Sequence, residues 1–111
     1  MSALPSSDGV GTQALAGEVT PRAVPLLENF GLAVRRMRAT RGLSQEQLAE
    51  RSDLNRSYVG EIERGQVVSS LVTIQKLSAA LEISASGLLQ ECEATANRRL
   101  VQGIKLTAIA C

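Results

Sequence analysis

The sequence has 111 residues and a net charge of +1, with twelve basic and eleven acidic side chains and no histidine. This length fits one small domain with tails, and the lack of histidine excludes histidine-based acid–base catalysis and histidine-ligated zinc. The two cysteines, Cys92 and Cys111, lack the spacing of a metal site or a disulfide framework, so we expect free thiols, no metal and no cofactor.

Residues 1–25 are rich in Gly, Ser, Ala, Thr and Pro and contain few large apolar side chains. Such a segment cannot bury enough surface to offset its ordering entropy, so we expect a disordered N-terminal arm. A role for this arm along a DNA backbone would depend on Arg22, its only positive side chain. The sequence shows no signal peptide and no long apolar run, which predicts a cytoplasmic protein without a membrane partner.

The first helix is expected to begin between Leu26 and Phe30, to run to about Arg41 and to end at Gly42. One apolar stripe at helical spacing should face the core: Phe30, Val34 and Met37. The arginines of this helix are candidates for phosphate contact or for a solvated helix face: Arg35, Arg36 and Arg41.

The stretch 44–65 predicts two short helices joined by a tight turn, the arrangement of a helix-turn-helix. Ser44 is a good N-cap for the first of these helices, and Gln47 completes a capping box with it. This helix is expected to end near Arg51 or Ser52.

The turn is expected at Asp53 and Leu54, and Asn55 is the N-cap of a second helix that runs to about Arg64 before Gly65 ends it. Two apolar residues three positions apart should share its buried face: Val59 and Ile62. The opposite side of the helix carries Arg56, Ser57, Gly60 and Glu61.

The N-terminal residues of such a second helix reach base edges when the helix lies in a DNA major groove. Arg56 is the main candidate, because a guanidinium donates two parallel hydrogen bonds to guanine O6 and N7. Tyr58 offers its hydroxyl to a phosphate. The residues expected to contact bases are Asn55, Arg56, Ser57, Gly60 and Glu61. The alternative is that Asn55, Ser57 and Gln45 serve only as helix caps and that Arg56 is an ordinary surface arginine.

The charge of this region is only weakly basic. Between Asn29 and Gln66 seven arginines stand against five acidic side chains, which leaves +2. DNA binding would therefore require the positive charge to lie on one face.

A fourth helix is expected after Ser70 as N-cap, and a fifth near Ser84. Four side chains of the fourth helix should face the core: Leu71, Ile74, Leu77 and Leu81. We expect the domain to cover residues 26–91. The apolar residues of the tail, 92–111, fit neither helical nor strand period, which favours a loosely ordered end over an extended dimer interface.

The segments FGLAVRRMRATRGLSQEQLA, LNRSYVGEIERG and SLVTIQKLSAALEIS together resemble the DNA-binding domain of the phage-repressor, or XRE, transcriptional regulators. Within that family the sequence is most similar to those of small solitary regulators, including restriction–modification controller proteins. The resemblance implies an all-α, five-helix, lambda-repressor-like fold with a flexible arm and a tail.

The resemblance also implies roles for single residues. Arg38 and Glu63 occupy positions that form a structural ion pair between the first and third helices. Gln45 lies where the family places a phosphate clamp, at a helix N-terminus. The expected DNA backbone contacts are Gln45, Tyr58, Arg64 and Arg35. The expected dimer contacts around the fifth helix are Ile83, Leu88 and Leu89, which could equally belong to the core.

The sequence departs from the family pattern where relatives have glycine. Asp53 stands in the turn, and Glu82 stands at the end of the fourth helix. If positive φ is retained at Glu82, the cost is about 1 kcal/mol. Gly87 replaces a common glutamate, which removes a capping-box partner from the fifth helix.

The leading functional hypothesis is a sequence-specific transcriptional regulator that binds a palindromic operator on double-stranded DNA as a homodimer. The second is an antitoxin or other protein-interaction module that binds a protein partner through its tails, its helix-turn-helix serving only autoregulation. An enzyme is disfavoured, because no activated nucleophile or acid–base constellation is recognisable.

Overall fold

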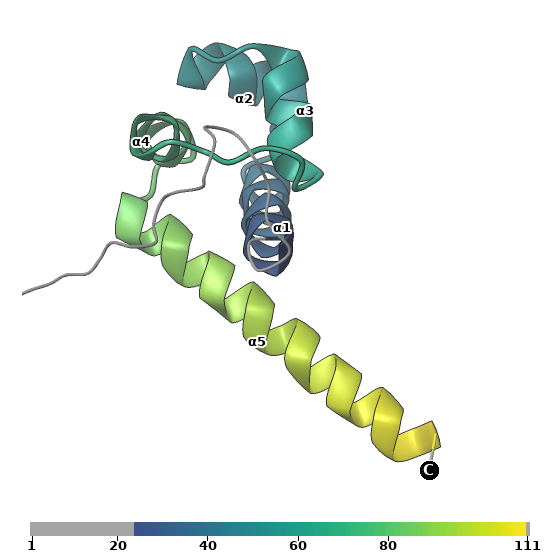
Figure 1. Cartoon of the computed structure of the whole chain (residues 1–111). Coiled ribbons are helices and arrows are strands. Elements are labelled where there is room, and N and C mark those ends of the chain that lie inside the picture. The colour runs from purple at the N-terminus through teal and green to yellow at the C-terminus, as the bar shows by residue number, and fades with distance from the viewer. Residues whose placement is uncertain (1–23, 111) are drawn as a thin grey trace, which may run out of the picture.

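Five helices make up the described part of the chain (Figure 1). The computed structural model describes the backbone of residues 24–110 and the side chains of residues 25–103. In chain order the helices are α1 (Val24–Thr40), α2 (Gln45–Ser52), α3 (Arg56–Glu63), α4 (Leu71–Ala80) and α5 (Ala85–Ala110). No strand occurs within residues 24–110, and the predicted all-α, five-helix class is confirmed. None of these helices combines the length and the apolar character needed to cross a lipid bilayer.

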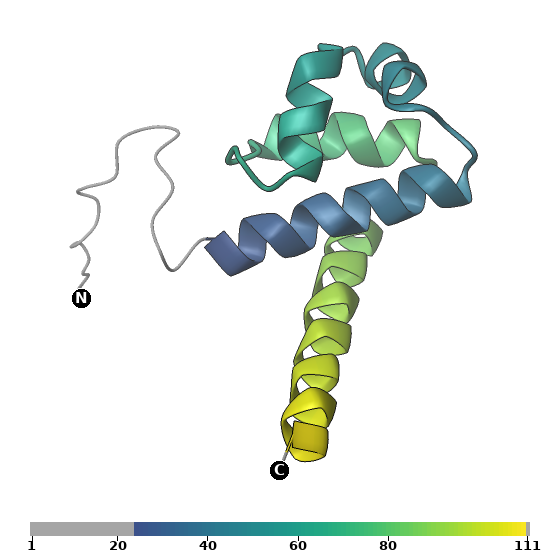
Figure 2. The same cartoon turned by 90° about the vertical axis from the view of Figure 1, so that its right-hand side faces the viewer.

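One hydrophobic core joins the five helices. Figure 2 shows α1 running across the molecule, with α2, α3 and α4 on one side of it and α5 on the other. Both sides bury apolar side chains against α1, whose Ala33 and Val34 are fully buried. The largest fully buried side chains are Leu48, Ile62, Leu77, Leu81, Leu88, Val34 and Val59.

α1 begins earlier than expected. It starts at Val24, because Pro25 falls in the first turn, where its missing N–H has no helical partner to lose. The expected disordered segment therefore overlaps the helix by two residues, and residues 1–23 lie outside the described part. Phe30 and Val34 are buried and Met37 packs partly buried against them, so the predicted stripe is confirmed.

α1 and α3 approach each other backbone to backbone at Gly31. A Cβ at this position would lie 2.6 Å from the carbonyl oxygen of Glu63 and still closer to that of Ile62. No side chain fits there without separating the helices. Nothing in the local sequence pattern distinguishes Gly31 from a weak helix former, so its contact with α3 could not be predicted.

α4 is capped as predicted, but its inner face differs from the prediction. The hydroxyl of Ser70 accepts a hydrogen bond from the N–H of Thr73 at 3.1 Å. Leu77 and Leu81 are buried, whereas Leu71 is 81% exposed, so its expected place in the core is wrong. Leu71 begins the helix on a side turned away from the core, and Thr73 takes the buried position in that turn.

α5 is a single helix of 26 residues through the expected boundary at residue 91. The expectation of a loosely ordered tail after that boundary is wrong for residues 92–110. Figures 1 and 2 show the C-terminal half of α5 extending away from the other helices. A helix segment that projects in this way needs no single apolar face, which is why its sequence lacks a helical period.

Two residues other than glycine have left-handed backbone conformations, Asp53 with φ 57° and Glu82 with φ 62°. Both occupy positions where the family pattern predicts glycine, so positive φ is retained at both departures. At Glu82, Arg41 donates hydrogen bonds to the main-chain oxygen at 3.3 Å and to the carboxylate at 3.4 Å. These bonds tie the end of α1 to the α4–α5 turn.

Candidate nucleic-acid interface

The first helix of the pair is fixed by local hydrogen bonds. The N–H of Gln47 donates to the Ser44 hydroxyl at 3.0 Å, and the N–H of Ser44 donates to the Gln47 side-chain oxygen at 2.8 Å. The predicted capping box is therefore present. At the other end of α2, the left-handed Asp53 lets the N–H of Leu54 donate to the carbonyl of Ala49 at 2.9 Å. These hydrogen bonds fix the backbone conformation of the turn between α2 and α3.

The N-terminus of α3 presents three polar side chains to the solvent. Asn55 caps the helix, its side-chain oxygen accepting from the N–H of Ser57 at 2.8 Å. Asn55, Arg56 and Ser57 are all exposed. Within the described side chains, Arg56 makes no hydrogen bond or ion pair, so its guanidinium is available to a ligand.

The opposite side of α3 is anchored in the core. Val59 is fully buried and Ile62 is 1% exposed, as predicted. Tyr58 packs partly buried against this core, and Glu61 is half-buried. The helix is therefore held on one side and accessible on the other.

Gly60 does not lie on the accessible side. The residue is buried, and a Cβ at this position would lie 3.1 Å from a terminal guanidinium nitrogen of Arg64. Gly60 is expected on the exposed side of the helix, opposite Val59 and Ile62. That expectation is wrong, because the side chain of Arg64 folds back over the helix surface at Gly60. Arg64 also donates from Nε to the side-chain oxygen of Gln66 at 3.3 Å.

The Arg38–Glu63 ion pair implied by the resemblance is present. Arg38 donates from Nε to Glu63 Oε2 at 2.6 Å and from Nη2 to Oε1 at 3.1 Å. The Glu63 side chain is 3% exposed and that of Arg38 16%. Arg38 also donates to the carbonyl of Leu43 at 2.8 Å, which ties the loop after α1 to the same pair.

Gln45 belongs to the same hydrogen-bond network, a link that sequence reasoning missed. Its side-chain nitrogen donates to Glu63 Oε1 at 2.9 Å. An amide nitrogen carries two hydrogens, so one remains for a phosphate. Gln45 and Glu63 are eighteen residues apart, and only the packing of α2 against α3 brings them together.

The expected dimer contacts separate into core and surface. Leu88 is fully buried and Ile83 packs partly buried against the core. Leu88 is therefore a core residue, and its predicted role as a dimer contact is wrong. Leu89 is 43% exposed, since the next residue on a helix points about 100° away.

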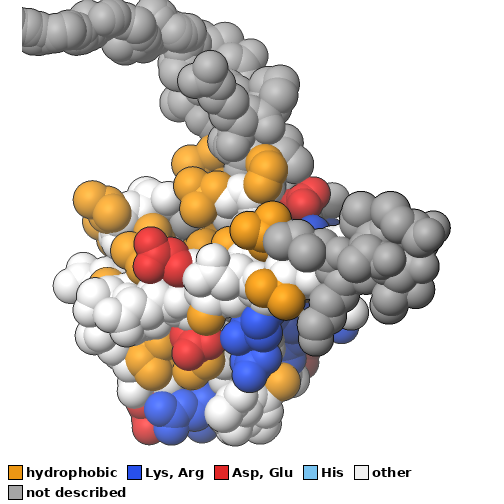
Figure 3. All heavy atoms as spheres, turned by 90° about the horizontal axis from the view of Figure 1, so that it is seen from below, with side chains coloured by type: hydrophobic (Ala, Val, Ile, Leu, Met, Phe, Trp, Pro, Cys, Tyr) orange, Lys and Arg blue, Asp and Glu red, His pale blue; other side chains and the backbone are white. Residues whose placement is uncertain are grey.

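Leu89 borders an apolar groove of about 140 Å³ between α1, the α3–α4 loop and α5. The exposed side chains around this groove include Leu26 at 60% and Val68 at 46%. Figure 3 shows several hydrophobic side chains exposed on the face of the molecule that is seen from below Figure 1. The hydroxyl of Ser69, which also lines the groove, is buried and has no hydrogen-bond partner among the described residues.

Comparisons with known proteins agree with this geometry. The helix-turn-helix family pattern matches residues 34–88. Control protein C.BamHI of Bacillus amyloliquefaciens is 44% identical over 61 residues, which cover 54% of this chain and 75% of that protein.

Two solved structures show the same arrangement of helices. The restriction-modification controller protein C.AhdI of Aeromonas hydrophila is 53% identical, with a TM-score of 0.55 over 56% of this chain and 94% of that one. The controller protein C.Esp1396I, solved as a tetramer in complex with its natural 35 base-pair operator, is 25% identical, with a TM-score of 0.60 over 64% of this chain and 93% of that one. The chain therefore belongs to the XRE-type helix-turn-helix family of DNA-binding transcription regulators.

Proposed function

We propose that this protein is a cytoplasmic, sequence-specific transcriptional regulator that binds a two-fold symmetric operator as a homodimer. One observation carries the proposal. Arg56 stands exposed and unpaired among the described side chains, at the N-terminus of a helix whose other face is anchored by Val59 and Ile62. A guanidinium held in this way can enter a major groove with little rearrangement of the protein.

Base recognition would centre on Arg56, with bidentate hydrogen bonds to a guanine. Ser57 lies beside it and can donate or accept. Asn55 uses its side-chain oxygen as a cap, so its amide nitrogen is left for a base or phosphate. Glu61, half-buried one turn further along, would accept from a cytosine amine.

Backbone contacts would fix the register of the protein on DNA without reading the sequence. Gln45 would donate its second amide hydrogen to a phosphate while its first remains on Glu63. Tyr58, Arg64 and Arg35 would contribute further contacts, since all three are partly or fully exposed.

The homodimer would form through the apolar groove and its rim. Leu89 and Leu26 are exposed there, and a second copy would bury them and fill the groove. Two recognition helices would then lie about one DNA turn apart, ~34 Å. The operator-bound tetramer of C.Esp1396I supports an oligomeric state on DNA for this chain as well.

A protein-interaction function is the second candidate. It is favoured by the C-terminal half of α5, which extends from the domain and exposes Leu100 and Val101 by 64% and 50%. This segment lies beyond the residues that match the family pattern. A small protein that co-purifies stoichiometrically from the native host, and is lost when residues 98–111 are deleted, would support this function.

Operator selection tests the leading proposal. The wild-type protein and Arg56→Ala would each select DNA from a random pool, with Arg51→Ala as control. Arg51 is also exposed and without a hydrogen bond or ion pair among the described side chains. We expect Arg56→Ala to lose preference at one guanine by about 1–3 kcal/mol, and Arg51→Ala to select the wild-type sequence. Unchanged preferred bases for Arg56→Ala would refute the assignment.

A further inference from the structure

A cleft of about 370 Å³ lies where α1, the end of α3 and α5 meet. Three arginines line it: Arg35 of α1, Arg64 directly after α3, and Arg99 of α5. Arg35 and Arg64 are 29 positions apart in the sequence, and Arg64 and Arg99 are 35 apart, so only the fold brings the three together. Arg99 lies beyond the residues that match the family pattern.

The cleft has more positive than negative charge available. Two carboxylates also line it, Glu28 and Glu63. Glu63 is already bound by Arg38 and Gln45 and is 3% exposed, so it neutralises no other arginine. Glu28 is the other acidic side chain among the described residues that line the cleft, and its carboxylate contacts only Arg99 of the three arginines.

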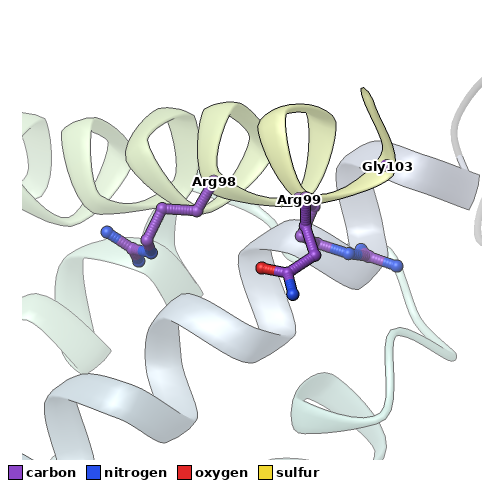
Figure 4. A pocket seen from close by; sticks show the side chains of 4 residues that line it. Arg98, Arg99 and Gly103 are labelled. Carbon is purple, nitrogen blue, oxygen red and sulfur yellow. The ribbon is translucent and has the colours of Figure 1, made fainter. Parts of the chain in front are cut away.

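Arg99 is held at the side of the cleft by α1. It donates to the side-chain oxygen of Asn29 at 2.7 Å and to the carboxylate of Glu28 at 3.4 Å. Figure 4 shows Arg98 and Arg99 leaving α5 on the side where α1 runs beneath it. Arg35 makes no hydrogen bond or ion pair with its side chain among the described residues, and Arg64 bonds only the neutral Gln66.

An explanation without a ligand is that these arginines offset the dipole at the C-terminus of α3. That effect is confined to the last turn of the helix and the residues directly after it. It accounts for Arg64, which directly follows α3, but Arg99 is engaged by side chains of α1 instead. Arginines that converge from α1, the end of α3 and α5 suit a phosphate group, because each guanidinium offers paired donors and a fixed charge.

We propose that this cleft binds a phosphate group, with Arg35 and Arg64 as direct ligands. Glu28 is the internal anion that partly occupies the cleft and holds Arg99 aside. When a phosphate enters, Arg99 exchanges the 3.4 Å contact with Glu28 for a phosphate oxygen. The phosphate can come from a free phosphorylated compound or from a DNA strand, and the chemistry is the same for both. The site shares Arg35 and Arg64 with the proposed DNA contacts, so its first test uses protein without DNA.

Calorimetric titration with pyrophosphate at constant ionic strength is that test. We expect saturable binding that weakens about tenfold in Arg64→Ala and in Arg35→Ala, the factor that 1.4 kcal/mol represents. Arg36→Ala is the matched control, since it removes the same charge from an exposed residue that does not line the cleft. Equal weakening by Arg36→Ala, or no saturable binding by the wild type, would overturn the proposal.

The role of Glu28 has a test of opposite sign. Glu28→Gln removes the competing charge and is expected to strengthen pyrophosphate binding several-fold, whereas Glu50→Gln, an equal charge change on α2, is expected to leave it unchanged. Weaker binding by Glu28→Gln would show that the carboxylate does not occupy the phosphate position.

A second experiment, with DNA present, distinguishes the two sources of phosphate. If a DNA strand occupies the cleft, pyrophosphate competes with DNA, and Arg99→Ala lowers the salt slope of DNA binding by about one. If a free compound is the ligand, saturating pyrophosphate leaves the salt slope of DNA binding unchanged in the wild type and in Arg99→Ala. Failure of DNA binding altogether would refute the proposed function while leaving the DNA-free titration as a separate result.

Discussion

Replacing Arg38 with methionine would leave the Glu63 carboxylate buried with one donor. In the wild type this carboxylate accepts from Arg38 at 2.6 and 3.1 Å and from Gln45 at 2.9 Å. Breaking a fully buried pair from one side costs about 3–5 kcal/mol. Since the Arg38 side chain keeps 16% of its exposure, we expect the lower end, about 3 kcal/mol. That is a large part of the 5–15 kcal/mol typical of a folded domain.

The double variant Arg38→Met, Glu63→Met removes both charges together. Well-packed apolar residues in place of a buried pair are often nearly neutral, so the double variant is expected to be more stable than Arg38→Met alone. Urea unfolding, followed by the helical circular dichroism signal, gives the free energy of unfolding of both variants, and we expect the m-value to stay unchanged. Arg41→Met is the control, because it breaks an ion pair with Glu82 whose side chains are 38% and 65% exposed.

The result that refutes this reasoning is additivity. If Arg38→Met costs less than about 1 kcal/mol, the pair is not desolvated as its geometry indicates. The same holds if the double variant loses as much stability as Arg38→Met and Glu63→Met lose together when each is measured alone. A loss in Arg41→Met as large as that in Arg38→Met would also count against it.

Two further predictions concern the packing of α1 and of α5. Gly31→Ala is expected to destabilise by about 1–3 kcal/mol or more in thermal or urea unfolding, because the new methyl meets the carbonyl oxygens of α3. Gly103→Ala should not destabilise, because no described atom beyond its own helix backbone lies within 4 Å of the added Cβ, and equal stability of Gly31→Ala and wild type would contradict the backbone contact. Burial, and then the charge of Glu93, raise the pKa of the Cys92 thiol above its ordinary value. The unfolded thiol therefore ionises at lower pH than the folded one, so stability is full below the ordinary thiol pKa and falls as pH rises above it. In a Cys111→Ser background, Cys92→Ala should reduce this alkaline loss in urea unfolding between about pH 7 and about pH 10, and an unchanged loss would show that Cys92 does not cause it.

Much of the fold could be predicted because its signals are local. Ser44, Asn55 and Ser70 each cap a helix through an N–H two or three residues away. The turn at Asp53 follows from its place between two caps and from the resemblance. Val59 and Ile62 are buried because their spacing suits one face of a helix.

The errors arise where a residue's surroundings come from elsewhere in the chain. Leu71 and Leu88 are both leucines at helical spacing, yet one is 81% exposed and the other fully buried. Spacing defines a helix face, but it does not say which face meets another helix. The continuation of α5 was missed for the related reason that its second half extends from the domain and buries no single stripe.

The sequence by itself determined that five helices form, the N-caps of α2, α3 and α4, and the exposed polar start of α3, since the caps and the exposed start depend on residues within about one helical turn. Only the tertiary structure decided that Gln45 bonds Glu63, that Gly31 touches the α3 backbone and that Arg35, Arg64 and Arg99 share one cleft. These contacts join residues from different helices. Their geometry depends on how the helices cross, and the crossing is set by the packing of the whole core around α1.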